Sequence, residues 1–460
     1  MIVPTSFKPS LTRIRSKRRS KKGQDVALHS HCPACLHSLA LVQETSSIPR
    51  TLSLNHFDFS RPAGFNRSNA RGKFIHNSIW KTCPLPSLPV LLAPTRFGTY
   101  GGRFAPESQM DALSELTLAF DRIISDCNFW AGYLSCPGIR PSPLRLAENL
   151  TRHAGGANIW LKREDLNQHG SHNIRNIVGQ ALIAHRLGKS EIVMDCGSAN
   201  HGIACAAICA RLKMKCTILM GSWDATCQKE DVERIKQLGA SLITVETGSA
   251  SRSTLRAAVN EALRYAVAHL STTYHILSGP IGPHPLPTIA RTFQSILGEE
   301  IKQQFGGGAG SSRVPDALVS PVGPGSTAVG MFHPFIDHPS VKLLGVEAAG
   351  AAPLSRGDVG VLHGCRTYLL QNDDGQILDS WSPSPDMNFP SVGPELACWK
   401  DMGRVEYATA TDDDAVRGVQ ILRDQEGVDS GLGTGYAVER TMKLARELGP
   451  GRDVVLLVTG

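Results

Sequence analysis

The sequence has little charge, few aromatic residues and no long apolar run. Charged residues make up 19% and aromatic residues 6% of its 460 residues. No run approaches the ~20 consecutive apolar residues of a membrane-spanning helix, so no membrane partner is expected. The sequence shows no secretory signal, and its twelve cysteines are not spaced like those of a disulfide framework, so we expect reduced thiols. The 41% of hydrophobic residues is typical of a globular protein with two or three domains.

The net charge of +7 is concentrated at the N-terminus. Residues 1–95 hold 14 Lys/Arg and 3 Asp/Glu, whereas residues 96–460 hold 34 and 38. The first segment is also rich in serine and proline without sustained periodicity, which predicts a disordered basic extension. The remaining chain is mildly acidic, so we expect no nucleic-acid partner.

The N-terminal segment leaves the compartment open. Its basic run, 13–22, is compatible with a mitochondrial transit peptide, a nuclear signal or a solvated tail, and a cytoplasmic location is the leading interpretation. One potential ligand cluster follows, formed by His29, His31, Cys32, Cys35 and His37. A zinc ribbon needs a second Cys-x-x-Cys pair, and the sequence has none, so no metal site is predicted.

From Phe97 onward, short apolar runs alternate with helical patterns. The predicted strands are 158–162, 191–194, 215–220, 241–245, 273–277, 316–319, 343–346 and 453–458. The predicted helices are 176–187, 201–212, 225–238, 253–268, 288–305 and 327–335. This alternation favours an α/β fold of doubly wound parallel sheets.

Several separate segments carry a family resemblance. They are Tyr100–Gly102, Arg140–Leu144, Leu161–Asn176, Gly282–Thr288, Gly345–Glu347 and Val392–Glu395. Together they resemble the tryptophan synthase β chain, in its fungal form, from Phe97 to Gly460. The resemblance implies the fold-type II architecture that depends on pyridoxal phosphate (PLP), with two doubly wound α/β domains, an interdomain active site and a homodimer. The implied domains are 96–138 with 172–290, and 139–171 with 291–460.

Asn173 is the main departure from this family. In the family, Ser-His is followed by a lysine that holds PLP as a Schiff base, whereas Ser171-His172 is followed here by Asn173. A carboxamide has no nucleophilic amine. We therefore expect no cofactor, with covalent PLP lost and non-covalent PLP left open.

The resemblance also identifies retained positions. The loop that binds the substrate carboxylate corresponds to Gly197, Ser198, Ala199, Asn200, His201 and Gly202. It opens a helix, whose N-terminal N–H groups suit an anion. Asp195 stands where the family has a catalytic glutamate, and His172 lies beside the lysine position. Both are predicted acid–base residues, with local capping as the structural alternative for each.

The former cofactor site is altered at several further positions. Its phosphate cup corresponds to Gly323, Pro324, Gly325, Ser326 and Thr327, together with Asn173, Glu347 and Thr459 elsewhere in the site. Pro324 removes one backbone donor from the cup because proline has no N–H group. Asn388 stands where the family has an aspartate that meets the substrate.

Three functional hypotheses follow from these residues. The first is a repurposed, PLP-independent enzyme that dehydrates, cyclises, isomerises or decarboxylates a carboxylate- or enolate-bearing metabolite, including aromatic or polyketide-like ones in fungal specialised metabolism. The second is a non-catalytic protein that acts as a partner subunit or binds a ligand, and the third is a decaying gene product. Residual PLP-dependent lyase chemistry is a further alternative. Retained Asp195 and His172 favour an enzyme. Partnership with an α chain is not expected, because the loop 350–360 is shorter than in the family.

Overall fold

The computed structural model describes residues 95–247, 252–306 and 313–460. All of them belong to one unit, Asn66–Gly460. The predicted extension 1–95, with its cysteine–histidine cluster, lies outside the described residues except for Thr95. Within the described ranges, no helix combines the length and apolar character needed to cross a membrane.

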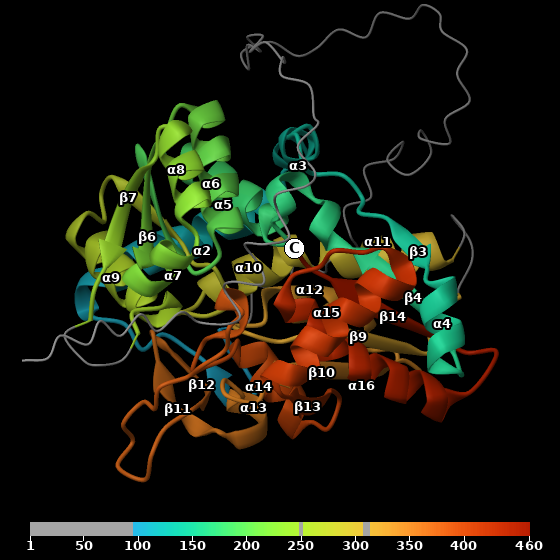
Figure 1. The fold of residues 1–460 in the computed structure, drawn as a ribbon. Coiled ribbons are helices and arrows are strands. Elements are labelled where there is room, and N and C mark those ends of the chain that lie inside the picture. Colours follow the sequence, from blue (N-terminus) through green and yellow to red (C-terminus); the bar gives the residue numbers. More distant parts are fainter. Residues whose placement is uncertain (1–94, 248–251, 307–312) are drawn as a thin grey trace, which may run out of the picture. The chain divides into compact units, whose positions relative to one another are not determined.

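Four parallel strands form the first sheet, in the order β7-β6-β5-β8 (Figure 1). They are β5 (Glu191–Cys196), β6 (Lys215–Gly221), β7 (Ser241–Val245) and β8 (Thr273–Ile276). The helices packed on them include α5 (Ile174–Arg186), α6 (Ala199–Leu212), α8 (Lys229–Gln237) and α9 (Leu255–Ala268). Ile192 and Met194 of β5 join the core with α5 and α6, whereas Val193 joins Ala258 of α9. Burial on both faces explains why this strand is an unbroken apolar run.

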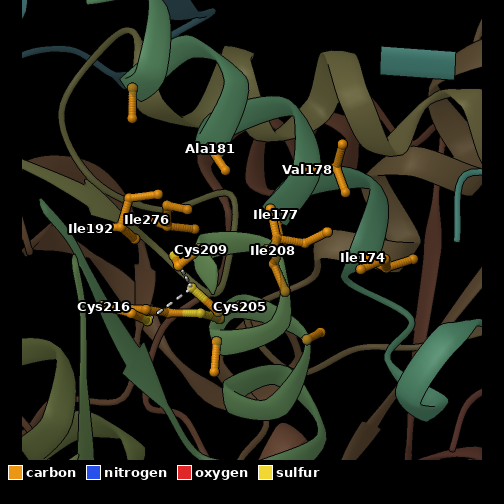
Figure 2. Close-up of a cluster of buried hydrophobic side chains, with 14 of the residues drawn as sticks. Ile174, Ile177, Val178, Ala181, Ile192, Cys205, Ile208, Cys209, Cys216 and Ile276 are labelled. Carbon is orange, nitrogen blue, oxygen red and sulfur yellow. Dashed lines mark hydrogen bonds between the residues drawn. The ribbon is translucent and has the colours of Figure 1, made fainter. Parts of the chain in front are cut away.

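Three cysteines belong to the core between α6 and β6, which Figure 2 shows. The Sγ atom of Cys205 lies 3.9 Å from that of Cys209 and 4.0 Å from that of Cys216. Ile192 and Ile276 are part of the same cluster. All three thiols are free and buried, and they pack here as small apolar side chains.

Six strands form the second sheet, in the order β13-β10-β9-β14-β4-β3, with only β3 antiparallel to its neighbour. They are β3 (Leu144–Leu146), β4 (Asn158–Arg163), β9 (Ala317–Pro321), β10 (Lys342–Ala348), β13 (Glu406–Ala410) and β14 (Asp453–Val458). In β14, Val454 and Leu456 enter the core with α16 (Leu432–Leu448). Val455 enters a second core with α12 (Ser326–Phe332). The sheet therefore carries helices on both faces, as Figure 1 shows.

The remaining elements surround these two sheets. A small antiparallel sheet joins β1 (Arg96–Phe97), β2 (Tyr100–Gly101), β12 (Cys365–Leu369) and β11 (Asp358–Leu362). The other α-helices are α2 (Met110–Ile124), α3 (Cys127–Leu134), α4 (Glu148–Ala154), α7 (Ser222–Cys227), α10 (Leu286–Gln294), α11 (Ile296–Phe305), α13 (Pro353–Arg356), α14 (Pro394–Asp401) and α15 (Asp412–Glu426). Short 3-10 turns are η1 (Glu107–Gln109), η2 (Glu164–Leu166), η3 (Gln168–Gly170), η4 (His333–Phe335) and η5 (Pro385–Met387).

The predicted fold class is confirmed, and all eight predicted strands are present. Two predicted helices are each divided in two. The 225–238 segment breaks at Gln228, whose backbone is not helical, and the 288–305 segment breaks at Ser295. The side chain of Gln228 contacts the loop after β5, with its Nε2 donating to Gly197 O at 2.9 Å and its Oε1 accepting from Ala199 N at 2.8 Å. This tertiary contact accounts for the break in a periodic sequence.

Candidate active site

One cavity lies where strands of both large sheets end. Its volume is about 40 Å³. Gly197 follows β5, Pro321 ends β9, Ser278 lies two residues after β8, and Thr459 follows β14; all four line the cavity. Ligands of open α/β sheets bind at the carboxyl ends of the strands, so this cavity is the candidate active site.

The loop after β9 offers backbone donors to the cavity. Gly323 through Thr327 all line it. The first backbone bond of α12 runs from Val329 N to Gly325 O at 2.9 Å, so the N–H groups of Ser326 and Thr327 have no acceptor inside the helix. Pro324 contributes no N–H, and its carbonyl accepts from Gly393 at 3.0 Å. The loop therefore keeps a reduced set of donors suited to an anion.

The two glycines of this loop are required by its geometry. Gly325 is left-handed, with φ of 98°, where it precedes α12. A Cβ at Gly323 would lie 2.0 Å from the backbone oxygen of Asp386. The close approach holds η5 directly against the anion loop.

The loop after β5 contributes less than the sequence predicts. Gly197 and His201 line the cavity, while Ser198, Ala199, Asn200 and Gly202 are not among its lining residues. The N–H of Ala199 is already bonded to Gln228, as described above. Their predicted role in carboxylate binding stays a prediction.

Asp195 and His172 do not meet at the same cavity. Asp195 is fully buried and is not among the residues that line the cavity. Its Oδ1 accepts a hydrogen bond from His275 Nε2 at 2.9 Å, and its Oδ2 accepts from the backbone N–H and the hydroxyl of Ser278. Asp195 therefore positions Ser278, which does line the cavity. His172 lines the cavity itself; burial, and then the charge of His201, lower its pKa to about 4. Its imidazole is neutral at pH 7.

A second polar group was not found from the sequence. Asp386, on η5, places its Oδ1 3.4 Å from His201 Nε2. The Nδ1 of the same histidine lies 2.8 Å from Ser171 Oγ. Burial raises the pKa of Asp386, but the electrostatic attraction of His201 outweighs burial and leaves the pKa lowered. Asp386 lies only two residues before Asn388, the one signal in the sequence that this segment faces the site.

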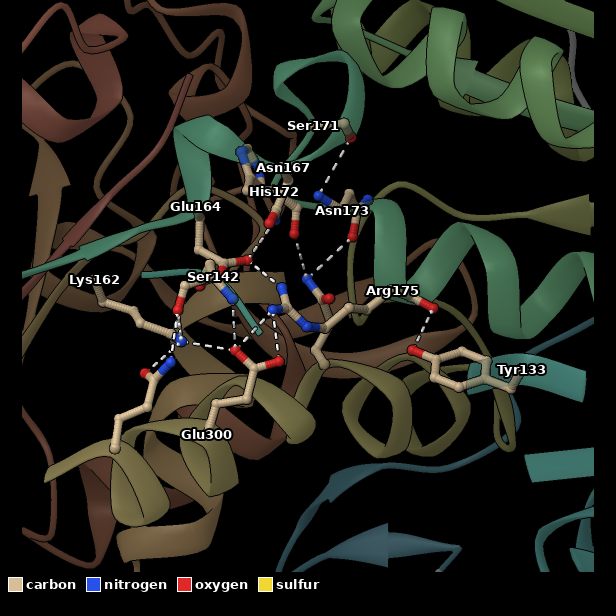
Figure 3. A network of polar contacts seen from close by, with 12 residues as sticks. Tyr133, Ser142, Lys162, Glu164, Asn167, Ser171, His172, Asn173, Arg175 and Glu300 are labelled. Carbon is tan, nitrogen blue, oxygen red and sulfur yellow. Dashed lines mark hydrogen bonds and ion pairs between the residues drawn. The ribbon is translucent and has the colours of Figure 1, made fainter. Parts of the chain in front are cut away.

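The side chain of Asn173, labelled in Figure 3, is held on both sides. It is fully buried; its Nδ2 donates to Ser278 O at 2.7 Å, and its Oδ1 accepts from Gln294 Nε2 at 3.2 Å. Its backbone N–H donates to Ser171 Oγ at 3.3 Å. The amide therefore ties α5 to the segment after β8 and to α10.

Glu347 and Thr459, both predicted for the former cofactor site, differ in position. Thr459 lines the cavity, and its backbone N–H donates to Thr434 Oγ1 at 2.8 Å. Glu347 lies outside the lining and accepts from the N–H groups of Leu354 and Ser355, each at 2.8 Å. Burial raises the pKa of Glu347 to about 7, and its hydrogen bonds partly offset the shift. Glu347 caps the start of α13, which is a structural role.

A buried ionic network lies beside the site (Figure 3). Arg175 contacts Glu164 and places its Nη2 2.8 Å from Glu300 Oε1. Lys162 Nζ lies 2.6 Å from Glu300 Oε2 and donates to Ser142 O at 2.8 Å. The two cations and two carboxylates neutralise each other and join β4, α5 and α11. Lys162 and Arg175 are thus committed to the fold.

Comparison with known proteins places the chain in a family. The sequence profile of the family described as pyridoxal-phosphate dependent enzyme matches residues 136–460. The chain belongs to this PLP-dependent family. Tryptophan synthase of Saccharomyces cerevisiae is 44% identical over 377 residues, covering 80% of this chain and 53% of the relative. The chain thus spans about half the length of that relative.

A solved structure supports the fold of this family member. A crystal structure of an O-ureido-L-serine synthase variant with O-ureido-L-serine bound has a TM-score of 0.52 and 20% identity to it. The match covers 70% of this chain and 88% of that chain. At this identity the likeness concerns the fold alone.

The family membership corrects one prediction. The expectation of no cofactor is wrong, because the family's enzymes depend on PLP and point to PLP here. The donors of Ser326 and Thr327 fit the phosphate of PLP. The described residues place no lysine in the lining of the cavity, and Asn173 carries an amide. The site fits the phosphate and supplies no amine for the aldehyde.

Proposed function

We propose that this chain is a lyase-type enzyme, diverged from the tryptophan synthase β chain, that converts a small carboxylate-bearing metabolite. The observation that carries the proposal is the composition of one cavity. Its lining combines the anion loop, Gly323–Thr327, with the polar group of His172, His201 and Asp386. Anion binding next to groups that stabilise or move charge suits elimination, isomerisation or decarboxylation.

Within this proposal, the Gly323–Thr327 loop holds the phosphate of PLP through Ser326 and Thr327. When bound, PLP supplies an electron-withdrawing ring that stabilises negative charge on an adjacent carbon. Asn173 stands at the position of the family's lysine, and its amide orients Ser278 and Gln294. The chain's own contribution is to fix the anion and to present His172 without a net charge.

The start of α6 suits the substrate carboxylate. His201 lies in its first turn and lines the cavity. The positive end of a 14-residue helix attracts an anion at this point. The same end of the cavity contains the carboxylate of Asp386, so the substrate's charge must be directed at the helix and away from Asp386.

A second candidate is a non-catalytic binding protein. The amide of Asn173, where the family has a lysine, favours it because the site supplies no amine. The cavity volume of about 40 Å³ is below the roughly 300–1,000 Å³ of ligand pockets and constrains both candidates alike. An enzyme with this cavity must open further to admit a substrate. Proton exchange in a bound ligand separates the two candidates.

The first experiment measures PLP binding to the full chain by equilibrium dialysis, with inorganic phosphate as competitor. We place the Thr327 hydroxyl beside the N–H groups of the loop as a further donor to the phosphate. Thr327→Val removes this hydroxyl and should weaken binding about tenfold, the size of one hydrogen bond to a charged group. Thr441→Val is the matched control, because Thr441 is buried on α16, where its hydroxyl donates to Ala437 O. Absence of phosphate competition, or equal loss in both variants, would refute the assigned loop.

The second experiment distinguishes the candidates by chemistry. The PLP-loaded chain is incubated in D₂O with L-serine and other small amino acids and 2-oxo acids. Exchange at C2 of the amino acids and at C3 of the 2-oxo acids is followed by NMR. An enzyme exchanges these protons faster than a control that contains the same concentration of PLP and no protein. Binding of PLP without exchange in any of these compounds favours the binding protein.

A further inference from the structure

Three side chains converge at the polar end of the cavity from separate segments. His172 precedes α5, His201 lies in α6 and Asp386 lies on η5. One ring nitrogen of each histidine and one carboxylate oxygen all lie within 4.8 Å of one another. The rings of His172 and His201 meet edge to face, with centroids 4.5 Å apart.

The spacing suits metal coordination better than a direct hydrogen bond. His201 Nε2 and Asp386 Oδ1 are 3.4 Å apart, beyond the usual 2.7–3.2 Å of an N–H···O bond. Zinc binds nitrogen and oxygen at about 2.0–2.2 Å in tetrahedral geometry, which separates two ligand atoms by roughly 3.3–3.5 Å. The observed separation therefore equals one edge of such a tetrahedron.

The histidines are prepared as ligands. The buried Nδ1 of His172 has no hydrogen-bond partner in the part of the chain that the structure describes. Buried polar atoms are nearly always bonded, so an orphaned imidazole nitrogen beside a cavity indicates a missing partner. Ser171 Oγ, 2.8 Å from His201 Nδ1, orients that ring so that Nε2 faces Asp386. Ligating histidines usually have such an outer partner on the second nitrogen.

The charge and the available space agree with a dication. Two imidazoles and one carboxylate match the donor set of catalytic zinc and of non-haem iron sites. Asp386 is 21% exposed, and His172 and His201 line the same cavity, so the site is open on one side. A volume of about 40 Å³ accommodates roughly three water molecules, which leaves free coordination positions.

We propose that His172, His201 and Asp386 bind one divalent first-row transition ion, of the zinc class, with an open position facing the cavity. The ion acts as a Lewis acid toward a carboxylate or carbonyl oxygen of the ligand. That catalytic role rests on the proposed function, whereas metal binding by the three residues stands apart from it. The ion also joins α5 and α6 to η5.

The test uses the full chain, stripped by a chelator and dialysed against micromolar Zn²⁺, with bound metal measured by mass spectrometry. Asp386→Asn and His201→Asn should each lose one equivalent of zinc. Asp379→Asn is the matched control, because Asp379 is an exposed carboxylate pairing with Arg256 at 2.9 Å. Ser171→Ala should weaken zinc binding by about 10- to 100-fold, as expected for an outer partner.

Other thiol and imidazole groups require their own control. Cys209→Ala and the Cys32→Ser/Cys35→Ser variant should keep the equivalent that Asp386→Asn loses. Co²⁺ in the wild-type site should give a visible d–d spectrum without thiolate charge-transfer absorption. Circular dichroism verifies that each variant is folded.

Two results would overturn the site: no zinc retained by the wild type, or the same equivalent retained by folded Asp386→Asn and His201→Asn. Zinc binding without PLP binding or proton exchange would support the metal site and reject the proposed enzyme. PLP binding and proton exchange in a wild type that holds no zinc would support the proposed enzyme and reject the metal site.

Discussion

Replacement of Arg175 by methionine should destabilise the fold strongly. The guanidinium is 2% exposed and neutralises Glu164 and Glu300, which are 0% and 5% exposed. Without it, Lys162 still pairs with Glu300, while Glu164 loses its ion-pair partner and keeps its hydrogen bonds to Ser142 and Asn167. Breaking a buried pair from one side costs about 3–5 kcal/mol, and we expect a loss near 4 kcal/mol in the free energy of unfolding.

The pH dependence of this loss follows from Glu164. Burial raises its pKa, but the charges of Arg175 and Lys162 outweigh burial and leave it lowered. A lowered carboxyl pKa stabilises the fold above the unfolded-state value of about 4.3, and this stability disappears as the pH falls through the folded-state pKa. The difference between Arg175→Met and the wild type should therefore narrow below a pH of about 4.

Urea unfolding at pH 7, followed by circular dichroism, measures the effect from the shift in midpoint. Arg175→Lys keeps the charge but not the forked contact and should lose less. Glu164→Gln/Arg175→Met removes the unpaired carboxylate and should recover part of the stability, because the two sites are coupled. Two results would refute the reasoning: a loss of less than about 1 kcal/mol in the free energy of unfolding for Arg175→Met, or a double variant that is less stable than Arg175→Met alone.

Two further predictions concern Asp224, on α7, and Gly323, in the anion loop. Burial, and then the charge of Asp386, raise the pKa of Asp224 to about 8, so its folded form stays protonated while the unfolded chain ionises. The wild type should therefore lose stability as the pH rises from about 4 to 8, and Asp224→Asn should not. The stability of Asp224→Asn relative to the wild type should be greater at pH 9 than at pH 5 by more than about 1 kcal/mol. Identical thermal unfolding profiles of the two proteins at both pH values would contradict this. Gly323→Ala should reduce PLP and zinc binding at least about tenfold, because its Cβ meets the Asp386 carbonyl at 2.0 Å and displaces η5. Gly132→Ala, whose Cβ meets nothing within 4 Å, should bind both normally in the same dialysis assays.

The sequence predicts most strands of the two large sheets, because most of these strands are apolar on both faces. Strands such as β5 and β14 are buried from end to end, so periodicity and length identify them without tertiary information. The short strands β3, β11, β12 and β13 were not predicted, because three to five partly exposed residues carry little pattern. The helix break at Gln228 depends on contacts with Gly197 and Ala199, about 30 residues earlier in the chain.

The sequence by itself determined the family segments, the fold class and the identity of residue 173, since each depends on local pattern or residue chemistry. Only the tertiary structure decided which polar side chains share a cavity. It buries Asp195 against Ser278 and His275, and it brings Asp386 to His201 from a distant segment. Orientation at the ends of parallel strands is set by loop packing, for which a single sequence carries no periodic signal.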